Sequence, residues 1–287
     1  MSFWTRHHAC SERTAASRET AGVAVVIPEL CLDLDRETAV LLRCLQSLEL
    51  EDWALDTPAD GWTVLDQIGH LAYFDEMETL AVTDPERFCA ARDVSRSEET
   101  SVIDAAVVAG RAMSPAATLD RFSASRAEMS RAFLDADPAA RVPWYGPSMS
   151  VGAAVTARIM ETWAHGQDVF DGLDRPHPVT TALRQVAHIG VRALPNSFRT
   201  RQLDVPTEPV YVRLEAPAGD LWEWGPIDSA DRVSGSALDF CLVATQRRHV
   251  ADAELEITGA VAQAWMDIAQ AFAGAAGTGR IPGQFPR

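Results

Sequence analysis

Apolar residues recur at helical spacing from Ile27 to the middle of the chain. Between residues 27 and 48 they fall at three- and four-residue steps, which is typical of one face of an amphipathic helix. A second helix is predicted to begin at Thr63, whose hydroxyl can cap the first free N–H groups, with Asp66 completing a capping box. Asp84-Pro85 is expected to end it. Four more helices are expected at residues 97–112, 117–134, 151–172 and 179–193, the last ending before Pro195.

After residue 196 the period changes from helical to strand-like. Residues 210–214 alternate between the two faces of a strand, and residues 221–224 do the same after a Gly219-Asp220 turn. The remaining elements are expected in the order strand 232–235, helix 237–249, strand 254–257 and helix 260–272. The result is a β-β-β-α-β-α unit.

The two patterns divide the chain into a helical domain and a smaller α+β domain. We expect the helical domain over residues 25–197 and the α+β domain over residues 205–275, with a linker between them. Residues 1–24 are polar and are predicted to form a disordered N-terminal tail. Residues 276–287 are rich in Gly and Pro and are predicted to form a flexible C-terminal tail.

Composition and charge narrow the range of possible functions. Hydrophobic residues make up 47% and charged residues 23%, as in a globular protein with a real core. The formal net charge of −16, with no basic stripe, argues against nucleic-acid binding. No apolar run approaches the ~20 residues of a membrane span, and the N-terminus lacks the apolar core of a secretory signal. We therefore expect a cytoplasmic protein that acts on small molecules; its oligomeric state is open.

The cysteines do not indicate a metal knuckle or a redox motif. The five residues are far apart and odd in number, which fits poorly with a complete disulfide framework. They are predicted to be reduced and mostly buried: Cys10, Cys31, Cys44, Cys89 and Cys241.

The candidate chemistry lies in the helix at residues 151–172. On a helix Glu161 and His165 are one turn apart on the same face, and Asp168 follows on the next turn. Burying such groups without partners costs several kcal/mol, on the order of the desolvation of each polar group. These residues therefore either face solvent, with Glu161 and His165 as a local pair, or form part of a functional site.

His70 lies in an earlier helix among residues expected to face the core. Alone it would be an ordinary core histidine, but in an antiparallel bundle it can meet the pair at Glu161 and His165. Two imidazoles and one carboxylate leave a coordination position open, as in catalytic zinc sites. Asp66 and Asp168, each about one turn from a histidine, could accept the other imidazole N–H.

These motifs resemble a known family. Gly61-Trp62-Thr63-Val64 leading to His70-Leu71, paired with Glu161-x-x-x-His165-x-x-Asp168, resembles the mycothiol-dependent maleylpyruvate isomerase family of the DinB-like superfamily of metal-binding four-helix bundles. The resemblance extends over nearly all of the chain from about residue 25. Two C-terminal segments look like the α/β second domain of an uncharacterised metal-binding branch, namely residues 221–226 and 239–249.

The resemblance implies both a fold and a site. The fold would be a DinB-like four-helix bundle followed by a small α+β domain. The metal ligands would be His70, Glu161 and His165, holding a divalent metal, usually zinc. Asp168 matches an aspartate used near the metal in catalysis. A second-domain arginine contributes to the site in the isomerase, and Arg247 or Arg248 is the nearest match.

The function implied is that of a metal-dependent thiol transferase or thiol-dependent isomerase. Mycothiol or a similar low-molecular-weight thiol would be the cosubstrate, and the other substrate a small electrophilic metabolite. Arg247 or Arg248 would hold a substrate carboxylate. The alternative is that both arginines lie at the solvent-exposed end of a helix, where positive charge favours the helix dipole. Two alternatives stay open: a hydrolase using metal-bound water, and a metal- or ligand-binding protein without turnover. Non-haem iron chemistry is compatible with the ligand set but less favoured.

Overall fold

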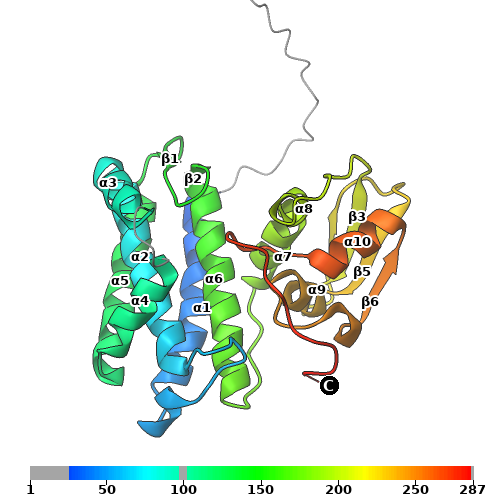
Figure 1. The fold of residues 1–287 in the computed structure, drawn as a ribbon. Helices are drawn as coiled ribbons and strands as arrows, with labels where there is room; N and C mark the ends of the chain where they lie inside the picture. The colour runs from blue at the N-terminus through cyan, green and yellow to red at the C-terminus, as the bar shows by residue number, and fades with distance from the viewer. Residues whose placement is uncertain (1–25, 97–101, 286–287) are drawn as a thin grey trace, which may run out of the picture.

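Four long helices pack together in the N-terminal half and a four-stranded sheet follows in the C-terminal half (Figure 1). The computed structural model describes residues 26–96 and 102–285. The predicted N-terminal tail at residues 1–24 lies outside them. The helices that pack on one another are α1 (Ile27–Leu45), α2 (Val64–Thr83), α5 (Pro115–Asp135) and α6 (Val151–Gly172).

Local sequence signals start these helices. The predicted capping box of α2 is confirmed, because the Thr63 hydroxyl accepts from the Asp66 N–H and the Asp66 carboxylate accepts from the Thr63 N–H. Ser114 and Ser150 cap α5 and α6 with their hydroxyls alone, which accept from the N–H groups of Ala117 and Ala153. The helices pack through large apolar side chains that are buried between them. Among these are Leu34, Ile68, Phe122, Phe133 and Trp163.

Two prolines begin helices rather than only ending them. Pro85 opens α3 (Pro85–Arg96), and Pro195 lies in the first turn of α8 (Leu194–Thr200). Proline is tolerated in a first helical turn because the N–H it lacks would have no helical acceptor there. Each proline therefore marks a boundary between two helices, where the sequence pattern indicated only one end.

The other helical predictions differ from the structure at their ends. The expected helix at residues 97–112 corresponds to α4 (Val102–Arg111), and residues 97–101 lie outside the described part. The connection between the helices expected at residues 117–134 and 151–172 holds a two-stranded ladder of β1 (Arg141–Val142) and β2 (Met149–Ser150). The helix expected from residue 179 is α7 (Leu183–Arg192). Pro176 and Pro178 precede it and favour extended backbone.

The second half has the predicted β-β-β-α-β-α order. Its sheet has the strand order β4-β3-β5-β6, with β3 parallel to β5 and the other pairs antiparallel. Val212, Leu214 and Val233 are fully buried with Phe240 and Trp265 of the two helices. The elements are β3 (Val210–Glu215), β4 (Leu221–Trp224), β5 (Asp231–Ser236), α9 (Ala237–Ala244), β6 (Leu255–Thr258) and α10 (Ala260–Ile268).

Helix α9 ends earlier than predicted, with consequences for the site. It stops at Ala244 instead of residue 249, and Gln246 takes a positive φ of 61°. The N–H groups of Arg247 and Arg248 both turn back to the Leu242 carbonyl. This reversal turns the two arginines toward α6, with which both form ion pairs.

The C-terminal residues return from α10 to the helical half (Figure 1). The residues expected to form a flexible tail make defined contacts as far as the structure describes them. Gly277 donates to the Gln270 side chain and accepts from Arg201, and Gly283 donates to Asp252. Within residues 26–96 and 102–285, no helix has both the length and the apolar character needed to span a bilayer.

Candidate metal centre and cavity

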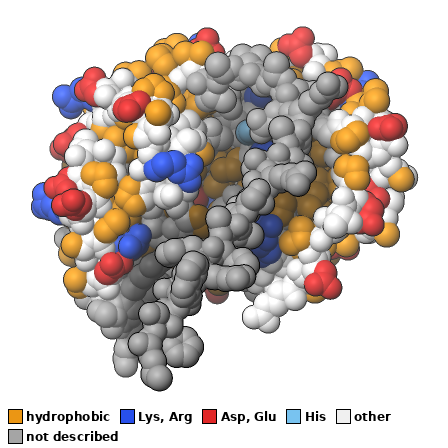
Figure 2. Space-filling view, turned by 90° about the horizontal axis from the view of Figure 1, so that it is seen from above, with side chains coloured by type: hydrophobic (Ala, Val, Ile, Leu, Met, Phe, Trp, Pro, Cys, Tyr) orange, Lys and Arg blue, Asp and Glu red, His pale blue; other side chains and the backbone are white. Residues whose placement is uncertain are grey.

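A cavity of about 570 Å³ lies between the helical half and the sheet half. Its walls come from α2 and the turn before it, from α6, from residues 245–247, and from the segment between residues 272 and 280. The space-filling view shows hydrophobic side chains in the hollow between the halves, with basic side chains and a histidine among them (Figure 2). We call residues 272–280 the strap.

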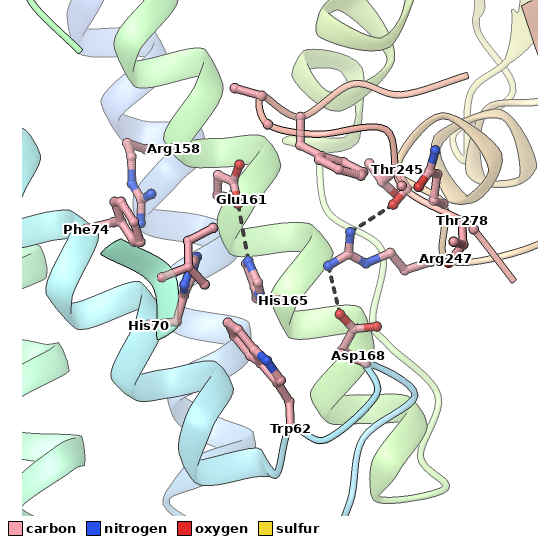
Figure 3. A pocket seen from close by; sticks show the side chains of 18 of the residues that line it. Trp62, His70, Phe74, Arg158, Glu161, His165, Asp168, Thr245, Arg247 and Thr278 are labelled. Atoms are coloured by element: carbon pink, nitrogen blue, oxygen red, sulfur yellow. Dashed lines mark hydrogen bonds and ion pairs between the residues drawn. The ribbon is translucent and has the colours of Figure 1, made fainter. Parts of the chain in front are cut away.

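The structure brings His70, Glu161 and His165 together on one wall of this cavity (Figure 3). One ligand atom from each lies within 4.8 Å of those of the other two. Glu161 Oε2 is 3.2 Å from His165 Nε2, and the two imidazole rings are 4.4 Å apart between centroids. This is the convergence that the sequence predicted.

Gln67 holds the His165 ring. The Thr57 hydroxyl donates to the Trp62 carbonyl, so it must accept from the Gln67 amide nitrogen. The Gln67 amide oxygen then faces His165 Nδ1 at 2.5 Å and accepts a hydrogen bond from the Nδ1–H group. With Nδ1 protonated, a neutral His165 presents the lone pair of Nε2 to the cavity.

The protonation states of His70 and Glu161 favour the binding of a cation. Burial lowers the pKa of His70 well below its ordinary value, and the positive charge of His165 lowers it further. Burial alone would raise the pKa of Glu161, but the hydrogen bond and charge of His165, with the charge of Arg158, hold it at about 2. A neutral imidazole and an ionised carboxylate are the forms that bind metals.

One atom of the cluster has no protein partner, and one pair of atoms in it needs a proton or a cation between them. His70 Nδ1 is buried and has no hydrogen-bond partner among the described residues. The lone pair of a neutral His165 Nε2 faces an ionised oxygen of Glu161, an arrangement that a proton or a metal ion between them would stabilise. The residues present therefore fit a divalent cation held by two nitrogens and a carboxylate.

A buried ion network underlies this wall. Asp75 is fully buried and accepts hydrogen bonds from Arg126 and Arg158. Arg126 also donates to Thr38 and Thr162, so the network joins α1, α2, α5 and α6. Arg158 reaches the cavity wall and places a fixed positive charge beside the cluster.

Asp168 and Arg247 also line the cavity, but Asp168 is not hydrogen-bonded to either histidine. Arg247 donates to one carboxylate oxygen of Asp168 at 2.7 Å (Figure 3). Arg280 of the strap donates to the other oxygen at 2.9 Å. Asp66, the second aspartate expected to support a histidine, instead forms a bidentate pair with Arg111.

Arg248 is not brought into the cavity. It forms a bidentate ion pair with Asp171, with N–O distances of 2.7 and 2.8 Å. Its guanidinium also lies 4.3 Å from the ring centroid of Phe285. The structure thus separates the two arginines that the sequence could not distinguish.

Sequence reasoning missed three polar residues of the site. Gln67 precedes His70 by three residues and was recognisable only as a neighbour on the same helix. Arg158 lies one turn before Glu161, so the same helical spacing places it on the face that carries Glu161 and His165. Arg280 lies in a segment without periodicity, so nothing in the pattern pointed to it.

Aromatic rings close the cavity around the cluster. Trp62 stacks on His165 with an interplanar angle of 17° and a centroid distance of 5.9 Å. The Phe74 ring lies 4.6 Å from that of His70 and packs with Trp144 and Tyr145. The cluster therefore faces a largely apolar chamber with arginines at its edge.

Comparison with known proteins agrees with this architecture. Residues 34–170 match the family described as mycothiol maleylpyruvate isomerase N-terminal domain, and residues 206–255 match one described as wyosine base formation. A crystal structure of the mycothiol-dependent maleylpyruvate isomerase superposes with a TM-score of 0.53 at 18% identity, covering 77% of this chain and 90% of that one. A mutant of that enzyme gives the same TM-score at 17% identity.

Two curated relatives match far more closely in sequence. The uncharacterized protein Rv0036c of Mycobacterium tuberculosis is 42% identical over 248 residues, which cover 86% of this chain and 96% of the relative. MT0041 from another strain of the same species gives identical values. The fold and the cluster define a two-part protein with a His/Glu/His set facing a cavity at the junction. The chain belongs to the mycothiol-dependent maleylpyruvate isomerase family.

Proposed function

We propose that the protein is a metal-dependent enzyme that uses a low-molecular-weight thiol of the mycothiol type as cosubstrate. It would transfer the thiol to a small electrophilic metabolite or use it to isomerise one. The observation that carries the proposal is the convergence of His70, Glu161 and His165 on one wall of the cavity. Membership of a family named for a mycothiol-dependent isomerase supports the choice of thiol.

The proposed metal ligands are His70, Glu161 and His165, and zinc is the metal that best suits two imidazoles and a carboxylate. When bound, such a cation lowers the pKa of a coordinating thiol so that the thiolate, the nucleophilic form, is present near neutral pH. Gln67 fixes the tautomer of His165 through the Nδ1 hydrogen bond. The helical domain, proposed at residues 25–197, would hold the metal, and the α+β domain at residues 205–275 would supply Arg247.

The remaining cavity residues would bind and orient the substrates. The Trp62 ring stacks on His165 and the Phe74 ring packs against His70, so both would shield the imidazoles. Both oxygens of Asp168 already accept hydrogen bonds from guanidinium groups, which supports a role in positioning arginines rather than in moving protons. Arg248 lies outside the cavity wall, and its pair with Asp171 supports a structural role.

Metal content tests the first half of the proposal. Purified protein should hold about one zinc per chain by elemental analysis, and His165→Ala should lose it. His188→Ala, which removes an exposed histidine of α7, is the matched control and should retain the metal. Full zinc content in His165→Ala would contradict the proposed ligand set.

A thiol-adduct assay tests the second half. The zinc-loaded protein should accelerate conjugation of mycothiol to a model electrophile such as a bimane, and His165→Ala should not. If thiol leaves the rate unchanged while a model ester is cleaved, the protein is a hydrolase. If zinc binds fully and neither assay responds, the protein binds metal without turnover, and the enzymatic proposal is wrong.

A further inference from the structure

The cluster of His70, Glu161 and His165 lies between two sides of the cavity that differ in chemistry. Figure 3 shows Phe74 and Arg247 on opposite sides of the cluster. The side built by the sheet half and the strap carries most of the polar side chains, namely Thr245, Gln246, Arg247, Thr278 and Arg280. The side built by the helical half carries large rings, and we call Trp62, Phe74, Trp144 and Tyr145 the aromatic wall.

The rings of the aromatic wall are continuous with the two histidines. The Trp62 ring lies 5.2 Å from that of His70, and the Phe74 ring lies 4.6 Å from it on the way to the loop between β1 and β2. The rings of Trp144 and Tyr145 then lie 6.1 and 5.8 Å from that of Phe74. A molecule whose reactive atom lies at the cluster can therefore place its adjoining group on these rings.

The far end of the aromatic wall is held in place by the protein. Trp144 and Tyr145 lie between the paired strands β1 and β2, and Arg92 of α3 donates to the Trp144 carbonyl at 3.2 Å. The Trp144 ring is parallel to the fully buried ring of Phe88 at a centroid distance of 5.6 Å. Because these rings are ordered before a ligand arrives, binding on them loses little conformational freedom.

The polar groups beside the aromatic wall are already committed to the protein. The Tyr145 hydroxyl hydrogen-bonds to Tyr73. Arg158 donates to Asp75 and to the Leu71 carbonyl, and its unpartnered Nε is buried out of reach of a ligand. A polar group placed against this wall would lose its water without gaining a partner, whereas a flat apolar group would gain burial and ring contacts.

We propose that the electrophilic substrate carries a flat, uncharged aromatic or conjugated group that binds on the aromatic wall, with its reactive carbon at the metal cluster. The polar side of the cavity would then face the thiol. This choice of substrate class rests on the proposed function. In the addition it implies, the thiol sulfur bonds to the electrophilic carbon and the thiol proton ends on the neighbouring carbon, so only thiol and electrophile are consumed.

Unreactive ketones test the aromatic wall without catalysis. Isothermal titration calorimetry on the full-length protein as purified should show that 4-phenylbutan-2-one binds about 10- to 100-fold more tightly than pentan-2-one, the effect of burying one phenyl ring. Trp144→Ala should weaken binding of the phenyl ketone about 5- to 20-fold, because part of that burial is lost. Phe74→Leu keeps apolar volume but loses the flat ring, so it should weaken binding by a smaller factor and guards against a folding defect in Trp144→Ala.

Trp224→Ala is the matched control, because it removes another partly buried tryptophan that lies outside the cavity wall. It should bind the phenyl ketone within about twofold of the unmodified protein, as expected for a ring that makes no contact with the ligand. Equal affinity for the two ketones, or equal losses in Trp144→Ala and Trp224→Ala, would overturn the assignment of the aromatic wall.

Two electrophiles with the same reactive group separate this inference from the proposed function. After division by the uncatalysed rates, mycothiol addition to 4-phenylbut-3-en-2-one should exceed addition to pent-3-en-2-one about tenfold in kcat/KM, and Trp144→Ala should abolish that preference. Equal acceleration of both enones would overturn the substrate class and leave the thiol chemistry standing. If mycothiol adds neither to the enones nor to the bimane while the phenyl ketone still binds, the proposed function alone is wrong.

Discussion

Gln67 determines which nitrogen of His165 is free for a cation. Its amide orientation is set by a chain of hydrogen bonds through the Thr57 hydroxyl to the Trp62 carbonyl. Because the amide oxygen accepts a hydrogen bond from Nδ1–H, the Nε2 lone pair faces Glu161 and the cavity. A side chain that never touches the metal would therefore control its affinity.

Gln67→Met should lower zinc affinity about 10- to 100-fold while leaving the three ligands in place, since supporting residues of metal sites have effects of this size. Competition with a chromophoric chelator measures the affinity. Gln263→Met, at an exposed position of α10, is the control and should change nothing. Unchanged zinc affinity in Gln67→Met would mean that the imidazole needs no such support.

Glu78 is a buried acid of α2 that the site does not use. Its side chain is almost wholly buried, and its Oε1 atom has no partner among the described residues. Burial raises the pKa of Glu78 from 4.5 to about 8, with Asp75 adding to the shift and Arg158 opposing it. Between these two pKa values the unfolded chain has lost the proton and the folded chain retains it, so stability falls as the pH rises.

Glu78→Gln should remove this loss. The variant should be more stable than the unmodified protein by about 2–4 kcal/mol at pH 8, because each pH unit in the window costs about 1.4 kcal/mol. The difference should shrink toward zero near pH 5. Urea unfolding at a series of pH values measures it, and a difference that does not vary with pH would refute the assignment.

The supporting residues were the part of the site that sequence could not predict. Asp66 and Asp168 have the right spacing from His70 and His165, but spacing does not reveal competing partners. Asp66 is committed to the helix cap and to Arg111, and Asp168 to two arginines. The convergence of the proposed ligands was easier to predict, because one helix aligns Glu161 with His165 and an antiparallel bundle can bring His70 beside them.

At the scale of elements, α6 carries most of the site. Arg158, Glu161, His165 and Asp168 all project from it into the cavity wall. Its first turn is fixed by Ser150, whose hydroxyl accepts from the Ala153 N–H. The cap thus stabilises the helix on which the cluster is built.

Ser150→Ala should destabilise the protein by about 1 kcal/mol, the usual cost of losing a helix cap. Ser123→Ala is the matched control, because that exposed serine lies within α5 and only returns a bond to the Leu119 carbonyl. The control should be neutral or slightly stabilising, since alanine favours helix interiors. Urea denaturation compares the two variants, and equal effects would show that the Ser150 hydroxyl adds nothing.

Periodicity and caps predict most elements, and the differences lie where helices end. Helix α9 ends at Ala244 because the chain reverses at Gln246, whereas apolar spacing alone suggested that it continued. The pattern predicts helix ends at Pro85 and Pro195, and both prolines also start the next helices. After α9 the backbone turns so that Arg247 and Arg248 meet Asp168 and Asp171, and the local pattern does not contain those partners. At the two prolines the pattern marks a boundary but does not show that a new helix follows it.

On the scale of the whole molecule, ion pairs join the two halves. Arg247 and Arg280 meet Asp168, and Arg248 meets Asp171, all on α6. The participants are 77 to 112 residues apart in the chain. No sequence pattern predicts such pairing.

The Arg248–Asp171 pair should hold the α+β half against α6 independently of the cavity. In a double-mutant cycle with Arg248→Met and Asp171→Asn, we expect a coupling energy of about 1–3 kcal/mol, because the pair is bidentate and mostly buried. The exposed Arg36–Asp33 pair of α1 is the control and should give about 0.5 kcal/mol or less. Urea unfolding followed by tryptophan fluorescence provides the free energies.

Zinc content should stay unchanged in Arg248→Met, because the pair contacts none of the proposed ligands. Additive effects of the two substitutions would mean that apolar packing between α6, α7 and α9 joins the halves, and that the ion pair only accompanies it.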